Sequence, residues 1–133
     1  MMIGGDGVRL AAWLFAALAL VVGLFHLVAI CGAPVGHLTM GGRWPGVLPP
    51  AVRLLSALSM GMTLLLAFVV LARAGVVDRS IPRWGMRAVL GYLALALPMH
   101  VATPSPGERK LWLPVILALI ASALWVEIKA PRG

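Results

Sequence analysis

One uncharged run near the N-terminus sets the class of this protein: residues 10–31 read LAAWLFAALALVVGLFHLVAIC. At about 1.5 Å per helical residue, this run is long enough to cross a bilayer core of roughly 30 Å. Its only ionisable side chains are His26 and the thiol of Cys31. The run therefore predicts a transmembrane helix.

The composition extends this conclusion to the whole chain. Hydrophobic residues make up 62% of the 133 residues, whereas soluble domains contain roughly 45–50% apolar residues. Charged residues make up only 11%, too few to cover the surface of a soluble domain. The apolar excess must face lipid, so we predict an integral membrane protein with a single transmembrane domain, residues 1–133.

Three further apolar runs complete the predicted helices, which we place at about residues 10–31, 50–74, 81–102 and 106–128. The second opens on Pro50, and proline suits the first turn of a helix. The third is long enough only if it includes residues 81–87, with Arg83 and Arg87 reaching toward the lipid headgroups. We therefore expect an all-α fold, a transmembrane four-helix bundle.

The fourth helix has the clearest start, because Ser105, Pro106 and Glu108 match a capping box. In this motif the serine caps the first turn, the proline is the first helical residue, and the glutamate bonds back to the serine amide. The cap accounts for Glu108, and a salt bridge to Arg43 or Arg53 is a further expectation. Catalysis by Glu108 is the alternative.

Lysine and arginine are divided unequally between the two ends of this bundle. With a cytoplasmic N-terminus, the inner side holds seven: Arg9, Arg73, Arg79, Arg83, Arg87, Lys129 and Arg132. The outer side then holds four: Arg43, Arg53, Arg109 and Lys110. Since positive residues favour the inner side, we expect both termini to be cytoplasmic, in the inner (cytoplasmic) membrane of the cell. Glu127 then lies at the inner end, where it pairs with Lys129 or Arg73.

The formal net charge of +7 raises the question of partners. The basic residues are spread between apolar runs, and no nucleic-acid motif is present, so nucleic acid is not expected. Membrane lipids with anionic headgroups are the expected partner. A second copy of this chain or another membrane subunit is the alternative.

The connection at residues 32–53 is long for a helical bundle, where roughly 2–8 residues are usual. It is rich in glycine and proline, which suits an ordered lid over the mouth of the bundle or a partly re-entrant segment. A surface loop anchored at the interface by Trp44 and Arg43 is the alternative. The candidate ligand-binding residues at this outer mouth are His37, Arg43, Trp44, His26 and His100.

Histidines and sulfur-containing side chains gather near the same end of the predicted bundle: His26, Cys31, His37, Met40, Met99 and His100. Imidazole and thioether groups suit copper, and imidazole alone suits zinc or haem iron. His26, His37 and His100 are therefore candidate metal ligands, although no short ligand motif supports them. The alternatives are a packing hydrogen bond for His26 and an interface position for His100. Beyond this the sequence indicates no cofactor.

Several reaction classes are disfavoured by missing motifs. The sequence has no phosphate-binding glycine loop with lysine, no Gly-x-Ser-x-Gly and no Cys-x-x-Cys. A nucleotide-driven pump and a thiol oxidoreductase are therefore not expected. Cys31 is the single cysteine, so no intrachain disulfide forms.

Two groups of residues resemble a known architecture. Residues 32–36 (GAPVG), Gly41-Gly42 and residues 48–50 (LPP) stand in the long connection, and Glu108-Arg109 precedes Trp112 and Pro114. Together they resemble a group of small bacterial four-helix membrane proteins of unassigned function. The resemblance covers most of the chain and implies the architecture without an activity. The chain is not similar to small multidrug transporters, since no glutamate sits midway in its first helix.

Three classes of function are consistent with these features. The one we favour is a non-enzymatic binding or accessory protein, with a site for a ligand, lipid or partner at the outer mouth of the bundle. The second is an oligomeric transporter or channel component. The third is a metal- or haem-binding membrane protein or enzyme that uses His26, His37 and His100.

Overall fold

The computed structural model describes residues 2–131, with side chains from residue 5 onward. These residues form four α-helices and two short 3₁₀ turns, and they contain no strand. The helices are α1 (Met2–Ile30), α2 (Pro50–Arg73), α3 (Trp84–Val101) and α4 (Pro106–Lys129). The prediction of an all-α, four-helix fold is confirmed. Arg132, counted above among the inner basic residues, lies outside the described residues.

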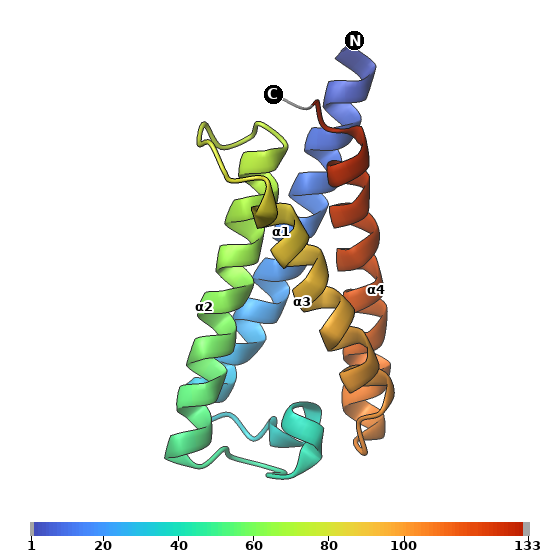
Figure 1. Ribbon diagram of the computed structural model, residues 1–133. Coiled ribbons are helices and arrows are strands. Elements are labelled where there is room, and N and C mark those ends of the chain that lie inside the picture. Colours follow the sequence, from blue (N-terminus) through green and yellow to red (C-terminus); the bar gives the residue numbers. More distant parts are fainter. Residues whose placement is uncertain (1, 132–133) are drawn as a thin grey trace.

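The helices alternate in direction along the chain (Figure 1). The start of α1, the end of α4 and the α2–α3 connection lie at one end of the molecule, which we call the termini end. The α1–α2 connection and the α3–α4 turn lie at the other, which we call the loop end. The ribbons of α2 and α3 are close at the termini end and diverge toward the loop end.

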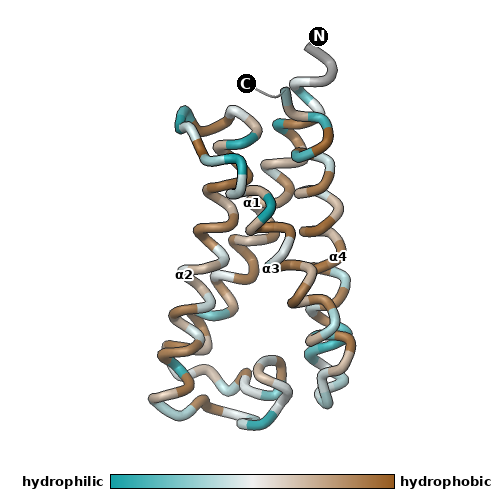
Figure 2. Tube along the Cα trace, viewed as in Figure 1, coloured by the Kyte–Doolittle hydropathy of each residue, from teal (hydrophilic) through white to brown (hydrophobic). Residues whose placement is uncertain are grey.

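Three of the helices are long and apolar enough to cross a membrane: Gly5–Ile30 within α1, Pro50–Arg73 and Pro106–Lys129. Large apolar side chains such as Leu10, Leu58 and Ile128 are exposed on their surfaces. Figure 2 shows hydrophobic residues along the helices and most hydrophilic ones toward the two ends. Such a surface is unfavourable in water and suits contact with lipid tails, so the helices support association with a membrane.

Two helix boundaries differ from the expected ones. α1 begins at Met2, well before the uncharged run, because the exposed Asp6 and Arg9 are compatible with a helix that extends beyond the apolar segment. α3 begins at Trp84 rather than at residue 81, and Arg83 is its N-cap. Pro82 lies in the turn before the helix, where its carbonyl accepts a hydrogen bond from the Gly85 amide. With 18 residues, α3 reaches only about 27 Å.

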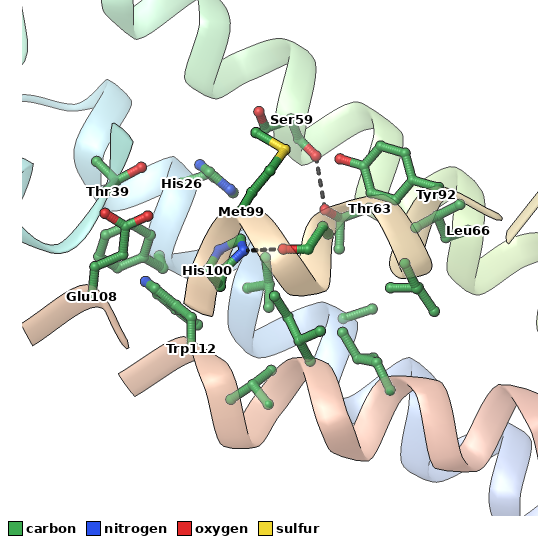
Figure 3. Close-up of a pocket in the computed structure, with 18 of the residues that line it drawn as sticks. His26, Thr39, Ser59, Thr63, Leu66, Tyr92, Met99, His100, Glu108 and Trp112 are labelled. Carbon is green, nitrogen blue, oxygen red and sulfur yellow. Dashed lines mark hydrogen bonds between the residues drawn. The ribbon is translucent and has the colours of Figure 1, made fainter. Parts of the chain in front are cut away.

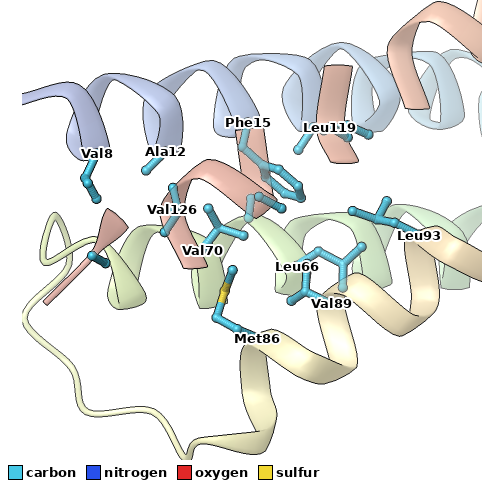
Figure 4. Packing of buried hydrophobic residues seen from close by; sticks show 14 residues of the cluster. Val8, Ala12, Phe15, Leu66, Val70, Met86, Val89, Leu93, Leu119 and Val126 are labelled. Carbon is cyan, nitrogen blue, oxygen red and sulfur yellow. The ribbon is translucent and has the colours of Figure 1, made fainter. Parts of the chain in front are cut away.

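The hydrophobic core occupies the half of the bundle nearest the termini (Figure 4). Every helix contributes to it, and its largest buried side chains include Phe15, Val70, Met86, Val89 and Val126. Fully buried alanines, such as those at positions 12, 19 and 123, let the helix backbones approach closely. This half is therefore tightly packed and fixes the relative positions of the four helices.

The long connection is an ordered segment with two 3₁₀ turns, η1 (Gly36–Leu38) and η2 (Met40–Gly42). It packs on a second, smaller cluster formed by Ala29, Leu48 and Val52. The amide of Gly36 donates to the carbonyl of Gly46 over 2.8 Å, which closes the loop on itself. A Cβ atom at position 36 would overlap the carbonyl oxygen of Trp44, so only glycine fits there.

We expect Gly36→Ala to destabilise the protein by about 1–3 kcal/mol, because the loop backbone must move to relieve the overlap. Thermal unfolding in mild detergent measures the effect. Gly61→Ala is the matched control, since a Cβ atom at that helical position meets nothing within 4 Å. Equal unfolding temperatures for both variants would contradict the close packing of the loop.

Candidate ligand-binding cavity

A cavity of about 270 Å³ lies between the four helices, in the half of the bundle nearest the loop (Figure 3). Each helix and the loop segment around η2 contribute side chains to it. Its apolar wall includes Phe15, Leu66, Leu93, Ile116 and Leu119. Toward the loop end the lining becomes polar, and Figure 3 shows Thr39, His26, His100 and Glu108 in that part.

The cavity exists because α2 and α3 diverge and small side chains face the space between them. Ala96 lines it from α3 and leaves room that a larger residue would fill. Tyr92 and Met99 also line it, yet they are 41% and 71% exposed. The cavity therefore opens at the surface of the molecule beside α3.

Two candidate residues, His26 and His100, line this same cavity. The Nδ1 atom of His26 lies 2.7 Å from Ser56 Oγ on α2, which is the packing hydrogen bond considered for this residue. His100 Nδ1 lies 2.8 Å from the carbonyl oxygen of Ala96. Because a carbonyl only accepts, this nitrogen is the donor, and Nε2 of a neutral His100 is left as an acceptor.

Glu108 is the buried acid of the cavity, with 7% of its surface exposed. Its Oε2 atom accepts hydrogen bonds from the Gly41 amide at 2.8 Å and from Thr103 Oγ1 at 3.1 Å. No described residue donates to Oε1. The carboxylate is thus held in place through one oxygen, while the other is free to accept from a ligand.

The capping box is formed only in part. Ser105 Oγ accepts from the Glu108 amide at 3.2 Å and Pro106 is the first helical residue, as expected. The return bond is replaced, since the Ser105 amide donates to Thr103 Oγ1 at 3.3 Å and the carboxylate turns to the loop. The salt bridges expected from Glu108 to Arg43 or Arg53 are not formed among residues 2–131.

Side chains of α4 and the residue before it hold the loop across the end of the cavity. Besides the bond from Glu108 to Gly41, Ser105 Oγ donates to the His37 carbonyl at 2.5 Å. Trp112 Nε1 donates to the Leu38 carbonyl at 2.7 Å. These bonds place Thr39 and Met40 in the cavity lining, so the loop forms its floor. The loop is thus an ordered segment across the mouth of the bundle, which is the first of the arrangements expected for it.

The other candidate residues of the loop lie outside the cavity. His37 and Arg43 are exposed, and the Arg43 guanidinium stacks 5.1 Å from the ring centroid of Trp44. Trp44 packs on the small cluster around Leu48. Since His37 does not join His26 and His100, the three histidines do not form one site. Within the described chain, no group of three or more His, Cys, Asp or Glu side chains is placed to hold a metal ion.

Comparison with known proteins adds no assignment: no family model, curated protein or solved structure matches this chain. The cavity itself is therefore the basis for a functional proposal. Sequence reasoning missed most of its polar lining, including Thr39, Thr63 and Tyr92. A weak signal existed in Ser59 and Thr63, which lie four residues apart on one face of an apolar helix.

We expect Glu108→Ala to loosen the floor of the cavity. The substitution leaves the Gly41 amide without its acceptor, at a cost of about 1–3 kcal/mol. Hydrogen–deuterium exchange at residues 36–42 should then be about tenfold faster. Glu108→Gln keeps an oxygen that accepts the same bond, so its effect should be smaller.

Glu127→Ala is the control for this measurement, because Glu127 pairs with Arg73 at the termini end, 3.7 Å away. That variant should leave exchange in the loop unchanged. Loop exchange at the wild-type rate in Glu108→Ala would show that the carboxylate does not hold the loop.

Proposed function

We propose that this chain is a non-enzymatic membrane protein that binds a small amphipathic molecule in the cavity between its helices. The cavity is the observation that supports this function. It combines an apolar wall, a polar end and an opening toward lipid, which are typical features of sites for lipid-like ligands.

The lining indicates the chemistry of the ligand. An apolar body would contact Phe15, Leu66 and Leu119. At the polar end, Glu108 Oε1 and the Nε2 atom of neutral His100 are acceptors, so a head that donates hydrogen bonds fits best. A hydroxyl or an amine meets this requirement.

The size of the cavity limits the ligand further. Its volume of about 270 Å³ lies just below the roughly 300–1,000 Å³ of sites for drug-sized molecules. A single short chain or a compact ring system fits this space better than a whole diacyl lipid. Because the opening lies beside α3, such a molecule would enter from the lipid phase.

We also propose that the loop end faces outward from the inner (cytoplasmic) membrane, with both termini in the cytoplasm. The support is the excess of lysine and arginine assigned to the inner side, seven against four. Trp84 and Trp125, both exposed near the termini end, suit the corresponding interface.

The single cysteine provides a test of this orientation. Cys31 is exposed at the loop end of α1, so a membrane-impermeant thiol reagent should label it in intact cells. Cys31→Ser with Asp78→Cys moves the thiol to an exposed position of the α2–α3 connection, where labelling should require permeable cells. Labelling of the second variant alone in intact cells would show the reverse orientation.

Ligand binding is tested with a brominated medium-chain fatty alcohol, which quenches tryptophan fluorescence on contact. The assay uses a variant in which Trp112 is the single tryptophan and Phe replaces the other four, Trp13, Trp44, Trp84 and Trp125. Several of the replaced residues are exposed to the detergent, whereas Trp112 is buried. We expect saturable quenching of Trp112, which lines the cavity.

A filled cavity is the decisive variant in this assay. Ala96→Phe places a ring in the cavity and should weaken binding at least about tenfold. Ala94→Phe adds the same ring at an exposed position of α3 outside the cavity and should bind as before. Equal, non-saturable quenching in all variants would contradict the proposal. Stoichiometric copper, zinc, iron or a haem spectrum in the same preparation would instead favour the metal- or haem-binding class.

A further inference from the structure

A second hollow lies at the termini end of the molecule, between the ends of α2 and α4 and the start of α3. It is a groove of about 540 Å³, and we call it the basic groove. Four arginines line it together with one acid: Arg73, Arg79, Arg83, Arg87 and Glu127. The charged side chains thus leave an excess of three positive charges in one concave site.

One of the arginines is already engaged within the protein. Arg73 Nη1 donates to the Pro131 carbonyl at 3.0 Å, and Nη2 donates to the Ala130 carbonyl at 3.3 Å. Its Nη2 also lies 3.7 Å from Glu127 Oε1, one of the two pairings expected for Glu127 from the sequence. Arg73 therefore ties the end of α4 to the end of α2, and it neutralises the acid of the groove.

The other three arginines have no such partners. Arg79, Arg83 and Arg87 are exposed, and no residue among 2–131 forms an ion pair or a side-chain hydrogen bond with them. Arg83 and Arg87 are four residues apart, one helical turn, and both line the groove. Glu127 pairs with Arg73 and with none of these three arginines. The three positive charges therefore form a site for an anion from outside the chain.

The surroundings of the groove identify the kind of anion. Trp84, 67% exposed beside Arg83, suits the headgroup level of a bilayer, as does the position where the apolar runs of α2 and α4 end. Ile81 and Met86 add apolar surface to the lining. α3 also starts here with no acidic residue in its first turn, so its positive helix end adds to the arginines.

We propose that the basic groove binds a phosphate group, carried by an anionic phospholipid of the surrounding membrane. The planar guanidinium groups match the oxygens of a phosphate with paired hydrogen bonds. The partly exposed Ile81 contacts the apolar part of the lipid next to its headgroup. This site is separate from the cavity of the proposed function, and it does not depend on that function.

The test is a lipid titration followed by native mass spectrometry of the full chain in mild detergent, where no membrane surface potential acts. Wild-type protein should bind one phosphatidylglycerol in preference to phosphatidylcholine. Arg83→Gln with Arg87→Gln should weaken this binding at least about tenfold. Both positions are exposed, so the unfolding temperature should stay near that of the wild type.

Arg9→Gln with Lys129→Gln is the matched control. It removes the same charge from the same end of the molecule, at exposed residues that do not line the groove. Its binding should stay within about twofold of wild type. Equal losses in the two double variants, or no loss in either, would overturn the proposal.

A second arm of the titration separates the two sources of phosphate. Bound phosphatidylglycerol that stays in place in millimolar inorganic phosphate identifies a lipid site. Displacement at that concentration would overturn the lipid assignment and identify a site for free phosphate.

Discussion

The need to satisfy buried backbone polar groups shapes the loop end of this protein. The helices bond their own backbones, whereas the turns of the connection at residues 31–49 leave some backbone groups to be paired by side chains of α4 and the residue before it. Glu108, Ser105 and Trp112 supply them, each from α4 or the residue before it. These three hydrogen bonds fix the floor of the cavity, and with it the polar end of the site, to α4.

The two halves of the bundle have different roles. At the termini end, buried alanines and branched side chains bring all four helices into close contact, and this packing holds the scaffold. At the loop end α2 and α3 separate, so the same helices enclose space instead of filling it. A rigid half supports an open half, which is how a small protein can keep a cavity without losing its fold.

The sequence predicted the architecture well and the site only in part. Hydropathy and length are properties of each run alone, so the four helices and the Ser105 cap were accessible from the sequence. The lining of the cavity depends on how the helices rotate and diverge, which no single run encodes. His26 and His100 could be grouped from the sequence, because both were expected near the same end of the bundle. Both line the cavity. The sequence assigned the Glu108 carboxylate to the helix cap. Its role as acceptor for the Gly41 amide could not be predicted, because Gly41 is 67 residues away along the chain.

The short length of α3 has a consequence for the membrane itself. At about 27 Å it falls short of a typical hydrocarbon thickness of roughly 30 Å, whereas its three neighbours exceed that thickness. In a bilayer crossed by the three longer helices, the hydrocarbon layer beside α3 would have to become thinner to match it, which costs fractions of a kcal/mol per Å. A mismatch of this kind would lie on one flank of the protein only, and a bilayer with shorter acyl chains would accommodate it with less strain.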